Sequence, residues 1–231
     1  MSQLANLVTA LSLLCGFISI ILSFEGYFVF SAYAIMFSVI LDGLDGRIAR
    51  KNKISSDFGK EFDSLVDVVS FGIAPVLLGY TFFYFHFHFL VGCSLFLYLF
   101  SSILRLTKYN IDKSAKKNCF TGLPTTVGGG VLASFVLIYG KRGDLILFKS
   151  TPLTFMILVL ILAYLMVSRA RYLNLDGLQQ LFGKRLKWVV LFLFIILSLA
   201  LYWDKIGAVL FFIFLIYLLF SPFMVKRLSS F

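Results

Sequence analysis

The sequence predicts an all-α protein, a polytopic membrane bundle of about eight transmembrane helices. Composition, the length of the apolar runs and the placement of charge each support this prediction. Of the 231 residues, 60% are hydrophobic and only 14% are charged, and the mean hydropathy is +0.96. A soluble domain of this size keeps a larger charged fraction for its surface. Apolar runs such as 4–24 and 189–203 approach the roughly 20 residues that a helix needs to cross the hydrocarbon core.

Charged residues, glycine and proline divide the chain into eight predicted spans with short connections between them. The spans are expected at 4–24, 27–46, 59–80, 85–107, 123–139, 152–170, 186–203 and 206–222. Neither a soluble domain nor a low-complexity linker is apparent, so residues 1–231 are predicted to form a single membrane domain. Cys15, Cys93 and Cys119 are scattered and form no CxxC pair, which argues against a zinc site or a disulfide framework.

The basic residues lie mainly on one predicted side of the membrane. With a cytoplasmic N-terminus, 17 of the 21 Lys and Arg residues fall in the even loops, their flanking helix ends and the C-terminal tail. The positive-inside rule then supports an even number of spans, with both termini on the cytoplasmic side of the cell's inner membrane. The net charge of +10 indicates contact with anionic lipid headgroups and a phosphate-bearing substrate. Nucleic acid is not expected as a partner, because no soluble basic domain is present to bind it.

Acidic residues cluster in one part of the chain. Six of the eleven fall in the 26-residue segment DGLDGRIARKNKISSDFGKEFDSLVD, which starts at Asp42. Asp42 and Asp45 are three residues apart at the end of the second predicted span, and Asp63 and Asp67 are four residues apart at the start of the third. Both spacings place two carboxylates on one face of a helix. Since the short connector reverses the chain, the two acidic faces are predicted to meet at the cytoplasmic membrane boundary.

Four carboxylates in an apolar setting either become partly protonated or are neutralised by cations, because like charges repel strongly where the dielectric constant is low. The acidic segment offers only oxygen ligands, which select hard cations such as Mg²⁺, Mn²⁺ or Ca²⁺. The four aspartates suffice for two divalent ions, and paired ions of this kind serve phosphoryl transfer. A cation transporter with an intramembrane ion site is the alternative from another functional class. The acids lie near a helix end, and no inverted repeat of the acidic pair occurs later in the chain. Both features favour an enzyme of phosphoryl transfer over a transporter.

The acidic segment resembles the signature of the CDP-alcohol phosphatidyltransferase family, D-x2-D-G-x2-A-R-x8-G-x3-D-x3-D. Every fixed position is met, by Asp42, Asp45, Gly46, Ala49, Arg50, Gly59, Asp63 and Asp67. The resemblance implies that the four aspartates bind two ions, Mg²⁺ or Mn²⁺, which hold the diphosphate of a CDP-linked lipid. It also implies that Asp67 is the general base and that Arg50 either contacts the substrate or braces the connector. Room for the cytidine is expected beside Gly46, Ala49 and Gly59.

The resemblance further implies nucleotide contacts from the first helix, for which Asn6 and Thr9 are the candidates. Three more segments resemble the phosphatidylserine synthase branch of the family: FDSLVDVVSFGIAP at 62–75, RLTKYN at 105–110 and GLPTT at 122–126. The implied substrates are CDP-diacylglycerol and L-serine, in contact with membrane lipids. Eight spans fit this branch, with a six-helix catalytic core at about 1–172 and two added C-terminal helices within about 184–222.

Candidate acceptor-binding residues follow the fourth predicted span and start the fifth. They are Arg105, Tyr109, Asn110, Lys116, Lys117 and Thr125. The cations in this set would equally suit glycerol phosphate or inositol phosphate, and choline is a further alternative acceptor. The predicted reaction is transfer of a phosphatidyl group to the serine hydroxyl with release of CMP. We also expect the chain to form a homodimer.

Overall fold

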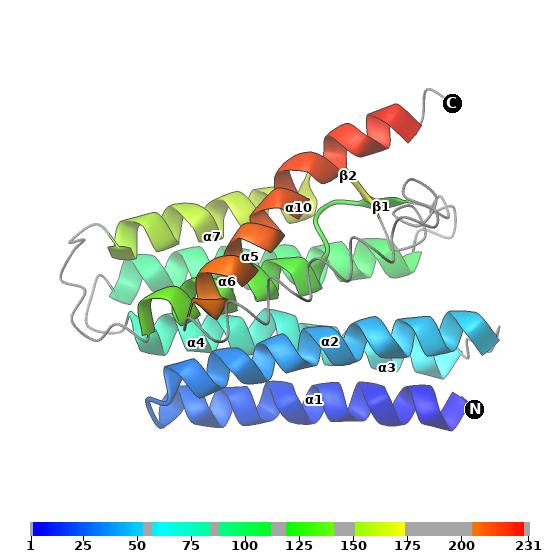
Figure 1. Cartoon of the computed structure of the whole chain (residues 1–231), viewed down its shortest axis with the longest axis horizontal. Helices are drawn as coiled ribbons and strands as arrows, with labels where there is room; N and C mark the ends of the chain where they lie inside the picture. Colours follow the sequence, from blue (N-terminus) through cyan, green and yellow to red (C-terminus); the bar gives the residue numbers. More distant parts are fainter. Residues whose placement is uncertain are drawn as a thin grey trace.

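The computed structural model describes residues 2–52, 57–83, 88–111, 119–140, 151–173 and 205–228 and shows an elongated helical bundle (Figure 1). Its long helices are α1 (Ser2–Phe24), α2 (Phe28–Asn52), α5 (His88–Ile111) and α10 (Ile206–Leu228). The third span consists of α3 (Asp57–Asp67), η1 (Val68–Ile73) and α4 (Ala74–Phe82) in direct succession. The described fold also contains the shorter helices α6 (Thr125–Gly140) and α7 (Thr151–Val167) and the strands β1 (Cys119–Thr121) and β2 (Arg171–Leu173).

The predicted all-α membrane bundle is confirmed. Within the described residues, five helical stretches are long and apolar enough to cross a membrane, and α6 and α7 are shorter apolar helices. Seven of the eight predicted spans coincide with these helices, and the remaining one, 186–203, lies outside the described residues. The two strands depart from the prediction. They pair antiparallel, with Phe120 opposite Tyr172, and strands of three residues are too short to produce a recognisable alternation in the sequence.

Helices α1 and α2 run antiparallel along one edge of the bundle (Figure 1). Gly26 lies in the turn between them with a φ of 81°, a left-handed conformation that glycine adopts without steric strain. Serine hydroxyls pair across the interface, Ser12 with Ser38 at 2.7 Å and Ser19 with Ser31 at 2.8 Å. Small hydroxylated residues let membrane helices approach closely and supply hydrogen bonds that lipid cannot. The interface thereby holds α1 against the helix that carries the first two aspartates.

The third span departs from the continuous helix that the sequence predicts. Directly after Asp67 the chain forms a short π-helix, η1, before α4 resumes α-helical geometry. In a wider π turn the backbone carbonyls can be shared with other donors, and the Tyr98 hydroxyl of α5 donates to the Phe71 carbonyl oxygen at 3.0 Å. The Ser70 hydroxyl in turn donates to the carbonyl oxygen of Ser12 in α1 at 3.2 Å. Two neighbouring helices therefore hold the segment that follows Asp67.

Close packing around η1 depends on two glycines from other helices. A Cβ atom at Gly16 of α1 would lie 2.9 Å from the Ser70 Cα, and one at Gly129 of α6 would lie 3.1 Å from the Phe71 Cα. Each of these neighbours is a backbone atom, which cannot move aside as a flexible side chain can. The lack of a side chain at Gly16 and Gly129 thus allows α1 and α6 to pack directly on the π-helix.

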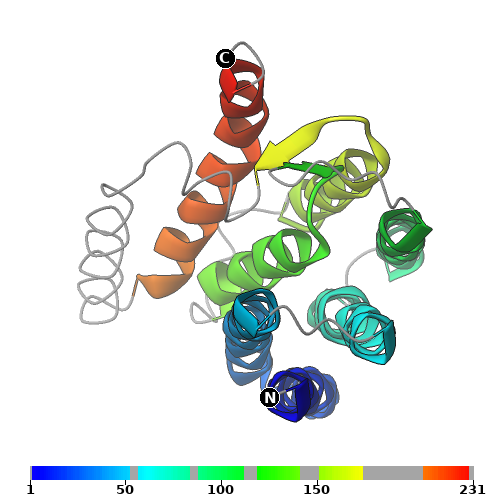
Figure 2. The ribbon, with the colours of Figure 1, turned by 90° about the vertical axis from the view of Figure 1, so that its right-hand side faces the viewer.

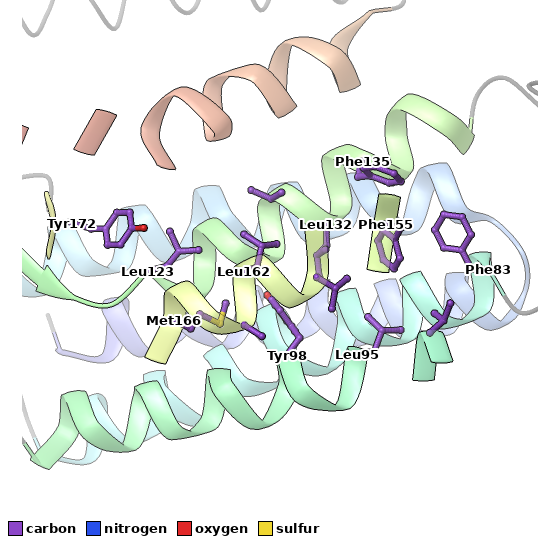
Figure 3. Close-up of a cluster of buried hydrophobic side chains, with 14 residues drawn as sticks. Phe83, Leu95, Tyr98, Leu123, Leu132, Phe135, Phe155, Leu162, Met166 and Tyr172 are labelled. Atoms are coloured by element: carbon purple, nitrogen blue, oxygen red, sulfur yellow. The ribbon is translucent and has the colours of Figure 1, made fainter. Parts of the chain in front are cut away.

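Two clusters of buried side chains stabilise the bundle. The larger lies mainly between α5, α6 and α7 and includes Tyr98, Leu132 and Phe155 (Figure 3). The smaller joins α2, α4 and α6 and includes Ile35 and Leu137. Because α6 contributes to both clusters, it is the central helix of the bundle, which the end-on view shows directly (Figure 2).

Helix α10 crosses α6 and reaches the strand pair at one end of the bundle (Figure 1). The chain turns sharply between β1 and α6 at Gly122, whose φ is 81°. A Cβ atom at Gly122 would overlap the carbonyl oxygen of Met166 in α7, so glycine is required for both conformation and space. This turn sets the start of α6 beside the end of α7.

We predict that Gly16→Ala lowers the thermal stability of the detergent-solubilised protein. The new Cβ would meet the Ser70 Cα at 2.9 Å and its Oγ at 2.6 Å, and such overpacking destabilises proteins by about 1–3 kcal/mol. Thermal unfolding followed by circular dichroism measures the effect. Gly92→Ala in α5 is the matched control, because its Cβ would have only an ordinary 3.7 Å contact with Tyr80. A Gly16→Ala protein that unfolds at or above the wild-type temperature would contradict the packing at η1.

Candidate active site

A pocket of about 350 Å³ lies where α2 and α5 approach their C-terminal ends, where α3 ends and where α6 begins. In Figure 1 this is the end of the bundle that carries the N-terminus and the two strands. Helices α2 and α3 contribute the acidic part of the lining, and α5, α6, β2 and α10 contribute the rest. The polar and charged lining residues are Asp42, Asp45, Asp63, Ser64, Asp67, Arg105, Tyr109, Thr125, Thr126 and Tyr217.

Asp42, Asp63 and Asp67 form the most compact group of acids in this pocket. One carboxylate oxygen of each lies within 4.8 Å of the others. Their four-residue spacing puts Asp63 and Asp67 on one face of α3, and Asp42 approaches them from α2. The structure thus brings together the acidic faces of the two helices, as their spacing in the sequence leads one to expect.

Asp45 lines the same pocket but does not belong to this group of three. Its Oδ2 atom accepts a hydrogen bond from the hydroxyl of Thr9 in α1 at 2.8 Å, and both residues are buried. The family resemblance implies that Thr9 contacts the nucleotide, whereas in the structure its hydroxyl contacts Asp45. Asn6, the other nucleotide candidate from α1, is half-buried one turn earlier in the helix. Helix α1 therefore orients one of the four carboxylates.

A buried cation, Arg105, lies close to the acidic group. Arg105 of α5 is buried, and its Nη1 atom donates to the hydroxyl oxygen of Thr125 at 3.0 Å. The Thr125 hydroxyl in turn lies 3.5 Å from Oδ2 of Asp67, a long contact in which it is the donor. These three residues form a chain of polar contacts that connects α5, through the start of α6, to the last residue of α3. A change at Arg105 can therefore affect the orientation of Asp67.

Two glycines keep the α2 side of the pocket open. Gly46 lines the pocket, as does Gly43, and a Cβ atom at Gly43 would have no neighbour within 4 Å. Gly59 lies half-buried in α3, one turn before Asp63, and is not part of the lining. Of the glycines that the signature singles out, Gly46 therefore adjoins the open volume, and Gly43, at a variable signature position, extends it.

Two of the predicted acceptor residues lie at the C-terminal end of α5. Tyr109 lines the pocket, and the Arg105 guanidinium carbon lies 6.0 Å from the centre of its ring, at the outer limit of a cation–π contact. Asn110 lies on the exposed side, where its Nδ2 atom donates to the Ser64 hydroxyl at 3.0 Å. Asn110 thus connects α5 to α3 through Ser64, which itself lines the pocket.

Four of the predicted site residues fall where the structure gives no side-chain description. Ala49 and Arg50 belong to the last turns of α2, and only their backbone is described. Lys116 and Lys117 lie outside the described residues.

Two pocket residues in the C-terminal part of the chain, Leu173 of β2 and Tyr217 of α10, are not predicted from the sequence. Tyr217 lies in the apolar run FFIFLIYLLF, where a single tyrosine gives no functional signal. Leu173 is an ordinary aliphatic residue at the end of a strand that the sequence does not predict. Only the tertiary structure, which folds α10 back over α6, shows that these residues reach the pocket.

The residues present fit a hard divalent cation. The three grouped aspartates supply only oxygen ligands, which Mg²⁺ and Mn²⁺ prefer. The Oδ1 atom of Asp67 is buried and has no hydrogen-bond partner among the described residues. Buried carboxylate oxygens are normally satisfied, so this atom points to a further ligand in the site. Asp42, Asp63 and Asp67 would hold the ion, with Asp45 beside them.

Comparison with known proteins agrees with the geometry. Residues 2–151 match the family described as CDP-alcohol phosphatidyltransferase. The chain is 35% identical over 200 residues to a CDP-diacylglycerol–serine O-phosphatidyltransferase of Helicobacter pylori, covering 85% of this chain and 79% of that protein. It is 34% identical over 179 residues to an archaetidylserine synthase of Methanothermobacter thermautotrophicus, covering 76% and 71%. A CDP-diacylglycerol–serine O-phosphatidyltransferase of Bacillus subtilis is 32% identical over 174 residues, covering 74% and 90%.

The match to the family extends over well more than half of the chain and includes all four aspartates. It confirms the family indicated by the acidic signature, and it removes the grounds for a cation transporter. The chain belongs to the CDP-alcohol phosphatidyltransferase family and is a membrane-embedded phosphatidyltransferase.

Proposed function

We propose that this enzyme transfers the phosphatidyl group of CDP-diacylglycerol to the hydroxyl of L-serine, giving phosphatidylserine and CMP. One observation carries the proposal: a single pocket joins the clustered carboxylates of α2 and α3 to the buried Arg105–Thr125 pair. The first group suits a metal-bound diphosphate, and the second suits a small acceptor that carries a carboxylate.

The donor would occupy the acidic side of the pocket. Asp42, Asp45, Asp63 and Asp67 would hold two divalent ions, Mg²⁺ or Mn²⁺. When bound, such ions neutralise negative charge on the diphosphate and on the departing CMP. Thr9 keeps Asp45 directed into the site, and the pocket volume beside Gly43 and Gly46 leaves space for the cytidine. Ala49, Arg50, Gly59 and Asn6 remain predicted contributors to nucleotide binding.

The acceptor would occupy the side formed by α5 and α6. The Arg105 guanidinium can pair with the serine carboxylate, because charge-assisted contacts of this type are strong where water is scarce. In the reaction, the serine oxygen forms a bond to the phosphorus that carries diacylglycerol, and the bond from that phosphorus to the CMP oxygen breaks. Asp67 accepts the proton of the serine hydroxyl.

The surroundings of Asp67 support its role as the general base. Its Oδ2 atom faces the Thr125 hydroxyl, which orients the carboxylate, while Oδ1 is without a donor among the described residues. The oxygen without a donor is the one available to the proton of the acceptor hydroxyl. The π-helix that begins at Val68 further fixes the backbone next to Asp67.

Two observations favour serine over the other acceptors. The names of the three relatives given above all include serine, although one names an archaetidyl lipid. Among the described lining residues, Arg105 is the one cationic side chain. A single guanidinium matches the carboxylate of serine, whereas glycerol phosphate and inositol phosphate carry a phosphate that calls for additional cations. Lys116 and Lys117 remain predicted acceptor residues.

Basic residues at the end of the bundle that contains the pocket support a cytoplasmic active site. Arg47 at the end of α2, Lys108 at the end of α5 and Arg171 of β2 belong to the regions that the positive-inside rule assigns to the cytoplasm. We therefore place the site at the cytoplasmic face of the inner membrane, with both termini on that side. The homodimer stays a prediction of the sequence.

Release of CMP from CDP-diacylglycerol by the purified enzyme tests the proposed function. We predict release with L-serine, complete inhibition by EDTA and recovery on addition of Mg²⁺ or Mn²⁺. Glycerol phosphate, inositol phosphate and choline serve as parallel acceptors. Release with one of these and not with serine would reject the acceptor, and full activity in EDTA would reject the role of divalent ions.

We predict that Asp67→Asn retains binding of CDP-diacylglycerol at saturating Mn²⁺ but loses turnover. Removal of a general base lowers kcat by about 10²–10⁴-fold. Asp45→Asn should instead weaken metal dependence and activity together. Glu25→Gln, at the exposed turn on the other end of α1, is the matched control and should behave as wild type. Wild-type turnover of Asp67→Asn would rule out Asp67 as the base.

We predict that Arg105→Gln raises the KM for serine at least tenfold, with a much smaller change in the KM for CDP-diacylglycerol. The loss of a charged hydrogen-bond partner corresponds to about 1.5–3 kcal/mol, roughly 10–100-fold in affinity. Steady-state kinetics with each substrate varied in turn measures both constants. Lys108→Gln, one turn further along α5 and exposed, is the control. Equal increases in both constants would argue against a specific contact with the acceptor.

A further inference from the structure

One wall of the pocket is formed by Leu173 of β2 and Tyr217 of α10. Both residues lie beyond residues 2–151, the part of the chain that matches the family. A role for these two residues therefore cannot be inferred from the family resemblance and has to be argued from their contacts.

Hydrogen bonds fix this wall. The Tyr217 hydroxyl donates to the Leu173 carbonyl oxygen at 2.7 Å, and the Leu173 amide donates to the Ser221 hydroxyl oxygen at 2.7 Å. Both backbone groups of the last residue in β2 are thus satisfied by α10. The rings of Tyr172 and Tyr217 also stack, with centroids 6.1 Å apart and planes 27° from parallel. Tyr217 consequently holds the end of β2 at the edge of the pocket.

The position of α10 is itself fixed by two glycine contacts with α6. A Cβ atom at Gly130 would lie 2.8 Å from the Phe214 Cε2 atom and would overlap the end of that ring. A Cβ atom at Gly207 would lie 2.8 Å from the Leu137 backbone carbonyl carbon. Helix α10 therefore packs in direct contact with the central helix, and Tyr217 lies one turn beyond Phe214.

The wall lies on the acceptor side of the pocket. Viewed along the bundle, α1 and α10 lie on opposite sides of α6 (Figure 2). The residues that suit the nucleotide and the metal ions come from α1, α2 and α3, and α1 packs on both α2 and α3. Tyr217 instead comes from α10, which packs on β2 with Leu173 and on α6, the helix that begins with Thr125.

We propose that Tyr217 is a positioning residue for the acceptor: through its bond to Leu173 it closes the acceptor side of the pocket and limits the size of the alcohol that reaches Asp67. This inference rests on the proposed function, in which that side of the pocket holds the acceptor. The wall admits an alcohol of the size of serine next to Arg105 and excludes longer ones.

Kinetics of Tyr217→Ala and Tyr217→Phe test this inference. Tyr217→Ala should raise the KM for serine about tenfold and leave the KM for CDP-diacylglycerol within about twofold. Tyr217→Phe, which keeps the ring and loses the bond to Leu173, should raise the KM for serine about three- to fivefold. The ratio of kcat/KM for homoserine to that for serine should rise about tenfold in Tyr217→Ala, because one methylene group decides access to a closed pocket.

Tyr164→Ala and Tyr164→Phe are matched controls, since Tyr164 is 74% exposed on α7 and does not line the pocket. A merely structural role for Tyr217 would lower kcat or stability and affect both substrates equally. That pattern, or an unchanged homoserine-to-serine ratio, would overturn the inference.

A second measurement follows the accessibility of position 217 in the absence of turnover. In an Asp67→Asn protein, which should bind CDP-diacylglycerol without turnover, Cys15, Cys93 and Cys119 are replaced by alanine and Tyr217→Cys is labelled with a small methanethiosulfonate reagent. Serine together with CDP-diacylglycerol and Mn²⁺ should slow the labelling at least threefold, while Tyr164→Cys should label at an unchanged rate. Equal labelling of Tyr217→Cys with and without serine would overturn the inference.

Wild-type assays separate this inference from the proposed function. If the wild type uses another alcohol and not serine, the proposed acceptor fails, and the same variants are then compared with the alcohol that is used. If the wild type releases CMP with serine and the Tyr217 variants match their Tyr164 controls, the inference alone fails.

Discussion

Repulsion among Asp42, Asp63 and Asp67 is the constraint around which the rest of the structure is arranged. Their carboxylate oxygens lie within 4.8 Å of one another at the end of an otherwise apolar bundle, where the low dielectric constant strengthens the repulsion. Such an arrangement is stable only when cations or protons neutralise part of the charge and when each carboxylate is held in place. The buried Arg105 supplies part of the neutralising charge, and the oxygen-only donor set suits the divalent ions that would supply the rest.

Holding the carboxylates in place explains several otherwise unusual features of the bundle. Thr9 binds Asp45 from α1, Thr125 faces Asp67 from α6, and η1 begins at the residue after Asp67. A π-helix accommodates an extra residue, so the side chains of α3 and α4 can face different surroundings: acids toward the pocket before it and apolar residues toward the core after it. Short π-helical segments are often found at functional sites.

The sequence predicted the helical bundle, the acidic faces and the family, because each depends on local spacing. The spacing of apolar residues and the length of apolar runs are enough to identify the spans. The four-residue separation of Asp63 from Asp67 places both on one helical face. The π-helix, the Thr9–Asp45 bond and the Arg105–Thr125 pair were not predicted, because each depends on which helices become neighbours. Seen in the sequence, Thr9 is only a polar residue in an apolar helix, and nothing local connects it with an aspartate 36 residues later.

The division of the pocket between different parts of the chain also bears on how acceptor specificity can vary within such a fold. The aspartates and their two helices lie inside the segment that matches the family, and a change there would affect the transfer chemistry itself. Tyr217 lies outside that segment, on a helix that packs mainly on α6 and β2 and carries none of the aspartates. Substitutions on α10 can therefore alter the acceptor side while the acidic side stays intact. A wall built from a separate helix lets specificity change without disturbing the carboxylates on which the chemistry depends.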